Sequence, residues 1–149
     1  RDVVILRRPM LPAASFDGFD KVQKFELKAG QAPGITQDME LVIGSHEGYV
    51  LYKDLDLTGI GSVTLIGSAP ASYMKGGTVE IHADAVNGPL LGKAEIKTNE
   101  DMAQSAFQIP VALKENNGIH NLYLTFTSAT GQDAVCTLTT LLFNRMESM

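Results

Sequence analysis

The chain has 149 residues and a mass of 16.0 kDa, which suits one domain rather than two. Hydrophobic residues make up 44% and charged residues 19%, a globular composition that excludes a disordered chain. The net charge of −5 excludes the basic face of a nucleic-acid-binding protein, and the absence of tryptophan excludes a ligand platform built from tryptophan rings.

Apolar and polar residues alternate along most of the chain with the period of two that is typical of β-strands. A break in this alternation within residues 21–28 indicates a β-bulge, and Pro110 predicts an edge strand or a bulge. Only residues 99–104 could hold a helical turn. The predicted strands are residues 3–8, 21–28, 40–44, 48–57, 62–68, 78–84, 90–98, 106–113, 118–127 and 134–144.

About ten short strands, joined by turn-forming residues, predict an all-β fold, a two-sheet antiparallel β-sandwich. We expect residues 1–149 to form a single β-sandwich domain, and no apolar run approaches the ~20 residues that span a bilayer. Because the chain starts at Arg1 without a signal peptide, we expect it to be excised from a larger multidomain protein. Cys136, the single cysteine, fits a strand pattern and is predicted to be a small core residue rather than a nucleophile.

Three of the predicted strands can be sorted into an apolar and a polar face. The apolar face carries residues such as Val50, Ile81 and Leu124. The polar face carries Tyr49, Lys53, Glu80, His82, Asp84, Tyr123, Thr125 and Thr127. If the three strands share a sheet, the polar face can hydrogen-bond to hydroxyl groups and stack against a ring. The alternative interpretation is an ordinary solvated sheet face.

No sequence motif indicates catalysis or metal binding. The three histidines lack the spacing of metal ligands, and we expect His46 to be solvated in a loop and His120 to cap a turn. Asp54 and Asp56 alternate with leucines, as in a strand rather than a calcium loop. We therefore expect no catalytic residue, no metal and no cofactor. A small hydrolase, built from carboxylates that only the fold brings together, is the alternative.

Four segments resemble carbohydrate-binding module family 6, or a close galactose-binding-like jelly-roll relative: residues 48–57 (GYVLYKDLDL), 76–84 (GGTVEIHAD), 87–92 (NGPLLG) and 118–126 (GIHNLYLTF). The resemblance extends from about Pro12 to Phe143. It implies a jelly-roll β-sandwich and a non-catalytic accessory module that tethers an attached enzyme to polysaccharide or glycan. It also implies a secreted bacterial parent protein, such as a glycoside hydrolase or sugar dehydrogenase, in an extracellular, cell-surface or periplasmic location.

In this family a cleft at the loop end of the sandwich usually holds a sugar between two aromatic rings beside an asparagine. The matching positions here are Ile43 or Gly44, Gln104 or Ser105, and Thr137. None of them supplies an aromatic ring or an asparagine, so the resemblance implies that this cleft does not stack a sugar.

A second family surface lies on the concave face of one sheet. Its aromatic position matches Tyr49, its acidic position matches His82 or Glu80, and a polar position matches Thr125. The resemblance implies that Tyr49 stacks on a sugar ring, that Glu80 and His82 bond to its hydroxyls, and that Tyr123 and Thr125 complete the wall. Binding would be weak, and would involve neither nucleic acid nor membrane.

The family often holds a structural calcium ion through an Ala-Glu pair near the N-terminus and an aspartate near the last strand. These positions match Ala13-Ala14 and Thr139, so we expect no calcium there. The missing cleft residues leave a second hypothesis open. In this second hypothesis the chain is a degenerate sandwich that contacts neighbouring domains of its parent chain without binding sugar.

Overall fold

The computed structural model describes residues 10–31, 35–114 and 117–146, which form nine strands and two short 3₁₀-helices. In chain order these are β1 (Met10–Pro12), η1 (Ala13–Ser15), β2 (Gly18–Leu27), β3 (Met39–Asp56), β4 (Ile60–Ser68), β5 (Gly77–Ala83), β6 (Leu90–Ile96), η2 (Met102–Gln104), β7 (Ala106–Ala112), β8 (Ile119–Ser128) and β9 (Ala134–Arg145). The all-β prediction is confirmed. The strand predicted at residues 3–8 lies outside the described residues.

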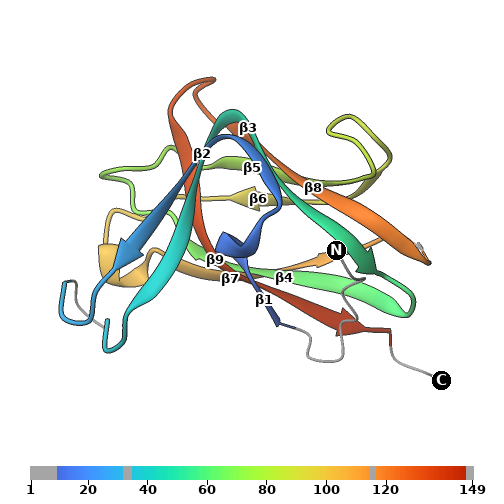
Figure 1. Cartoon of the computed structure of the whole chain (residues 1–149). Helices are drawn as coiled ribbons and strands as arrows, with labels where there is room; N and C mark the ends of the chain where they lie inside the picture. Colours follow the sequence, from blue (N-terminus) through green and yellow to red (C-terminus); the bar gives the residue numbers. More distant parts are fainter. Residues whose placement is uncertain (1–9, 32–34, 115–116, 147–149) are drawn as a thin grey trace.

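Every strand pair is antiparallel, in the order β6-β5-β8-β3-β9-β4-β7, with β2 added to β3 and β1 added to β9. Figure 1 shows two layers, with β2, β3, β5, β6 and β8 in one and β1, β4, β7 and β9 in the other. Strand β3 joins them, because Val42–Ser45 pair with β9 whereas Tyr49–Asp56 pair with β8. The fold is therefore the predicted jelly-roll sandwich, closed nearly into a barrel.

Two strands predicted separately, residues 40–44 and 48–57, are one continuous strand in the structure. The segment between them, residues 44–48, was expected to be the loop that holds His46. Instead, Glu47 adopts a positive φ of 65° inside β3, which bends the strand without ending it. As a result His46 lies in a strand, and the predicted loop for it is wrong.

The core lies between the two layers and is lined by the residues that the alternation assigned to it. Tyr52, Phe126 and Phe143 are among the largest fully buried side chains, and the Tyr52 hydroxyl donates to Ala13 O at 2.6 Å. Cys136 is also fully buried, and burial raises the pKa of its thiol to about 12. Its predicted place in the core is confirmed.

Two local irregularities also match the prediction. The bulge in β2 lies between Asp20 and Val22, where Lys21 has a φ of 52°. Pro110 lies in β7, which is at the end of the strand order and pairs with β4. Of the described residues, none forms a helix long and apolar enough to cross a membrane.

The contact between Gly44 and Phe126 gives a test of the packing at the point where the layers meet. A Cβ atom on Gly44 would lie 2.3 Å from Phe126 Cε1, and that ring is itself buried. Gly44→Ala should therefore lower the free energy of unfolding by about 1–3 kcal/mol, measured by urea denaturation. Gly18→Ala is the matched control, because its Cβ would meet only the flexible end of Leu51 at 3.3 Å.

A second substitution makes this test specific for the ring. Gly44→Ala combined with Phe126→Leu should cost less than the sum of the two single changes, because the smaller side chain makes room for the new methyl group. Additive costs would show that Gly44 is needed for some other reason.

Candidate functional site

Strands β5, β8 and β3 are neighbours in one layer, and their register brings the five predicted site residues onto one surface. Glu80 pairs with Thr125, which pairs with Tyr49. In the next outward-facing row, His82 pairs with Tyr123. The rings of Tyr49 and Tyr123 lie 5.7 Å apart at an interplanar angle of 50°. We call this surface, made of Tyr49, Glu80, His82, Tyr123 and Thr125, the β5–β8–β3 face.

A groove of about 350 Å³ lies on this face. It is lined by Glu47, Gly48, Glu80, His82, Val86, Asn87, Thr125, Phe126 and Thr127. The groove therefore contains three of the five predicted residues, while Tyr49 lies beside it as the strand partner of Thr125. Neither lysine nor arginine lines it, and its two carboxylates are those of Glu47 and Glu80.

The sequence prediction missed Glu47, Val86 and Asn87. Glu47 reaches the groove because the bend in β3 turns it toward the face. Val86 and Asn87 belong to the loop between β5 and β6, which folds back because the Ala83 N–H donates to Pro89 O at 3.0 Å. At Gly88 a Cβ atom would lie 2.0 Å from Ala83 O, so only glycine allows this approach. The Asn-Gly-Pro sequence predicted the turn but not where the turn would lie.

Both ring nitrogens of His82 have partners within the protein. Nδ1 lies 2.7 Å from Gly88 O, and Nε2 lies 2.9 Å from Glu80 Oε1. The His82 side chain is 13% exposed, whereas that of Glu80 is 36% exposed. No nitrogen of His82 is left to bond to a ligand, so the direct contact expected of His82 is not supported by this geometry. Glu80 keeps an accessible carboxylate.

The other two histidines have other partners within the protein. His120, at the start of β8, contacts Asp84 Oδ2 through Nδ1 at 2.8 Å and Asn117 O through Nε2 at 2.9 Å. It therefore contacts the turn before β8, as expected of a turn or cap residue, and through Asp84 it also joins the ends of β5 and β8. The Nδ1 atom of His46 accepts from the Ser128 N–H at 3.0 Å, and its side chain is 24% exposed, so it is not freely solvated.

The loop end of the sandwich has no aromatic pair at the positions that the resemblance named. Ile43 pairs with Thr137 across β3 and β9, and Gly44 faces the Phe126 ring. Thr137 is buried, and its hydroxyl is 2.8 Å from the Ser68 hydroxyl and accepts from the Ser68 N–H at 3.0 Å. The Thr137 hydroxyl therefore forms hydrogen bonds within the protein, to Ser68.

The residues at the family's calcium position do not fit a calcium ion. Ala13 and Ala14 are buried and have no side-chain oxygen, while Ala13 O already accepts from Tyr52. The Thr139 hydroxyl donates to Ile66 O at 3.1 Å. Across the described ranges, no group of three or more His, Cys, Asp or Glu side chains could hold a metal.

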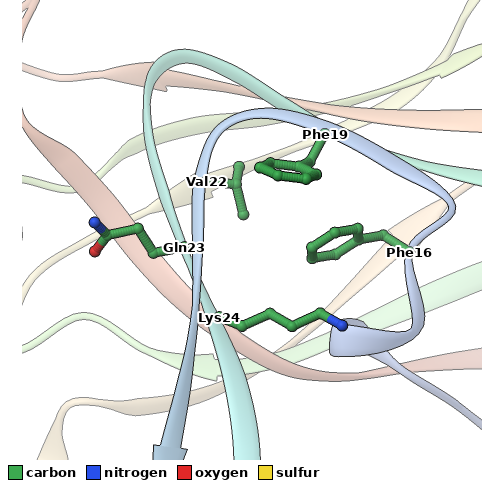
Figure 2. Close-up of a pocket in the computed structure, with 5 residues that line it drawn as sticks. All are labelled: Phe16, Phe19, Val22, Gln23 and Lys24. Carbon is green, nitrogen blue, oxygen red and sulfur yellow. The ribbon is translucent and has the colours of Figure 1, made fainter.

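A larger groove of about 600 Å³ lies at the edge of the sandwich, beside β2. Figure 2 shows Phe16, Phe19, Val22 and Lys24 pointing into it, whereas Gln23 points away. The phenylalanine rings are 5.0 Å apart, and Lys24 Nζ lies 4.9 Å from the centre of the Phe16 ring. The side chains that line this groove include no carboxylate or hydroxyl. They are poorly suited to bind several sugar hydroxyls, and the smaller groove is the better candidate.

The fold is a jelly-roll sandwich, and one sheet face carries a polar groove with an adjoining tyrosine pair. The profile of the family "Carbohydrate binding module (family 6)" matches residues 18–145. The chain belongs to this family, and it is a non-catalytic carbohydrate-binding module.

Solved structures share the fold at low sequence identity. A β-1,3-glucan binding module from Bacillus halodurans has a TM-score of 0.77 and 16% identity, over 96% of this chain and 99% of that one. A family 6 module from Clostridium cellulolyticum in complex with xylose has a TM-score of 0.71 and 20% identity, over 91% and 96%. A Bacillus subtilis family 43 arabinoxylan arabinofuranohydrolase has a TM-score of 0.73 and 18% identity, over 98% of this chain but 28% of that one. No match was found among the curated proteins.

The His120–Asp84 pair predicts how stability depends on pH. The hydrogen bond to Asp84 raises the pKa of His120 above the ordinary 6.5. The contribution of His120 to the free energy of unfolding is therefore complete below pH 6.5 and is lost as pH rises through the pKa of the folded state. Partial burial disfavours the ionised form of Asp84, but hydrogen bonds from His120 and the Asn121 N–H outweigh it and lower its pKa below 3.8. The contribution of Asp84 to the free energy of unfolding is therefore lost as pH falls through the pKa of Asp84 in the folded state.

We therefore expect His120→Asn to destabilise the protein most between about pH 4 and 6.5, with a smaller difference from wild type at higher pH. Urea denaturation of both proteins from pH 4 to 9 measures this. A difference that stays constant over the whole range would contradict a charged His120–Asp84 pair.

Proposed function

We propose that the chain binds polysaccharide or glycan on the β5–β8–β3 face and so holds an attached enzyme close to its substrate. The observation that carries this proposal is the register that aligns Glu80, Thr125 and Tyr49 across three strands, next to a groove. An aromatic ring, a carboxylate and a hydroxyl in one row match the alternating apolar and polar surfaces of a sugar.

Each group in the row has a separate role. Tyr49 stacks against the apolar side of a sugar ring, and its tilted contact with Tyr123 fixes the ring orientation. Glu80 accepts hydrogen bonds from adjacent hydroxyls, and Asn87 both donates and accepts at the opposite wall. Thr125 contributes its hydroxyl between them. Because these groups are partly exposed, we expect weak binding.

The charge of the groove indicates the class of sugar. Glu47 and Glu80 line it without any lysine or arginine, and the nearest partner of Glu47 is Lys21 at 3.5 Å. Carboxylate or sulfate groups on a ligand would meet like charges there. Neutral glycans are therefore favoured. The named ligands of two modules with this fold, β-1,3-glucan and xylose, are neutral.

The module is proposed to act inside a larger protein outside the cytoplasm, at the cell surface, in the periplasm or in the medium. Its fold matches 28% of the Bacillus subtilis arabinofuranohydrolase chain, which supports a role as one domain of a longer chain. A glycoside hydrolase or a sugar dehydrogenase would fit as the attached enzyme, with neighbouring domains as further partners.

One observation favours the alternative of a module that binds neighbouring domains instead of sugar. Phe19 is 57% exposed at the edge groove, where Phe16 and Val22 complete an apolar surface. If glycan binding leaves Phe16, Phe19 and Val22 unaffected, the edge groove does not take part in sugar binding and stays available for a neighbouring domain.

Replacement of Tyr49 tests the proposed site. Tyr49→Ala should weaken binding to a neutral polysaccharide at least tenfold, because stacking on this ring supplies much of the contact area. Isothermal titration calorimetry and affinity electrophoresis with soluble β-1,3-glucan and xylan measure the change, with alginate as the anionic comparison.

Tyr73→Ala is the matched control, because Tyr73 is 68% exposed and does not belong to the face. It should bind like the wild type. Equal binding by wild type and Tyr49→Ala, or stronger binding to alginate than to the neutral polymers, would contradict the proposed site.

A further inference from the structure

His82 connects the floor of the groove to its wall. Its Nε2 atom is 2.9 Å from Glu80 Oε1 on the sheet, and its Nδ1 atom is 2.7 Å from Gly88 O in the loop that carries Val86 and Asn87. Both partner atoms are oxygens that accept hydrogen bonds. This combination determines where the protons of the pair must lie.

A carbonyl oxygen has no proton to donate, so Nδ1 must carry one toward Gly88 O. A neutral imidazole has only one N–H, and its Nε2 lone pair would then face a carboxylate oxygen at 2.9 Å. That contact is repulsive unless a proton lies between the two atoms. Because a carboxylic acid is a stronger acid than an imidazolium, the proton belongs on Nε2. A hydrogen bond at this contact therefore joins an imidazolium to a carboxylate and is charge-assisted.

We infer that His82 is a positioning residue whose second proton holds the Glu80 carboxylate in place at the groove, so that glycan binding weakens as this proton is lost at higher pH. In the protonated pair, Oε1 of Glu80 is held by His82 and Oε2 can accept from a sugar. Without the proton, the carboxylate turns away from the Nε2 lone pair. Histidine is the side chain that changes charge near neutral pH. The effect on glycan binding rests on the proposed function, but the proton placement does not.

The other charged and titratable groups around His82 do not replace Glu80 as its partner. They are Asp84 just after β5, Tyr123 on β8, Lys93 on β6, and Glu47 and Tyr49 on β3. Asp84 is bonded to His120 at 2.8 Å, and Glu47 is paired with Lys21 at 3.5 Å. Lys93 lies opposite Glu80 on the neighbouring strand. Within the part of the chain that the structure describes, Glu80 is the only carboxylate bonded to His82.

Nuclear magnetic resonance of the whole chain tests the proton placement without any ligand. Imidazole ¹⁵N shifts should show both nitrogens of His82 protonated at about pH 5.5. His46 is the internal comparison, because its Nδ1 atom accepts a hydrogen bond from the Ser128 N–H. As pH rises, the side-chain carboxyl ¹³C resonance of Glu80 should move with the same midpoint as His82. Affinity for a β-1,3-glucan oligosaccharide should fall about tenfold over the same interval.

Two variants separate positioning from general stability. In Glu80→Gln the amide N–H₂ can donate to a neutral Nε2, so binding should be weaker than in wild type and should lose its pH dependence over the His82 titration. Tyr73→Ala changes an exposed side chain that does not line the groove, and it should keep the wild-type pH dependence.

The outcomes distinguish this inference from the proposed function. An unprotonated Nε2 on His82 while Glu80 is ionised would overturn the inference. So would a Glu80 resonance that does not move with His82, or an affinity that stays constant through the His82 titration. Coupled titration without binding of any glycan would support the positioning role and contradict the proposed function.

Discussion

The architecture depends on one strand that takes part in both layers. The N-terminal half of β3 pairs with β9 and its C-terminal half pairs with β8, and the bend at Glu47 lies between the two halves. Gly44 lies on the N-terminal side of that bend, packed against the Phe126 ring. The same bend places Tyr49 opposite Thr125 and Glu47 at the groove. If β3 ended at the bend, Glu47 and Tyr49 would belong to different elements, and one strand would not place both of them at the groove.

The β5–β8–β3 face obtains its chemistry from register, not from a pocket that encloses a ligand. Antiparallel pairing puts side chains of three strands in rows about 5 Å apart, so that short polar and aromatic groups become neighbours. The loop between β5 and β6 adds a wall, and His82 holds that wall and Glu80 together through its two nitrogens. A binding surface of this kind needs little burial, in keeping with a module that holds a polymer rather than one that transforms it.

The faces and the fold class could be predicted from the sequence because they follow from a local period of two, and the buried Val50, Ile81 and Leu124 confirm this. The role of His82 could not, because its partner Gly88 O comes from a loop whose path is decided by a backbone hydrogen bond between Ala83 and Pro89. The continuity of β3 was missed for a related reason. A glycine in a sequence often indicates the end of a strand. Only the structure shows that Gly44 lies within β3 and allows the Phe126 ring to pack closely against the backbone.

The central claim is that glycan binds across the β5–β8–β3 face. Titration of ¹⁵N-labelled protein with a short β-1,3-glucan or xylan oligosaccharide, followed by amide chemical-shift mapping, tests it most directly. We expect shift changes that centre on Tyr49, Glu80, Asn87 and Thr125 and leave the edge groove and the loop end unchanged. Shift changes centred on Phe16 and Phe19, or on Ile43 and Thr137, would contradict it.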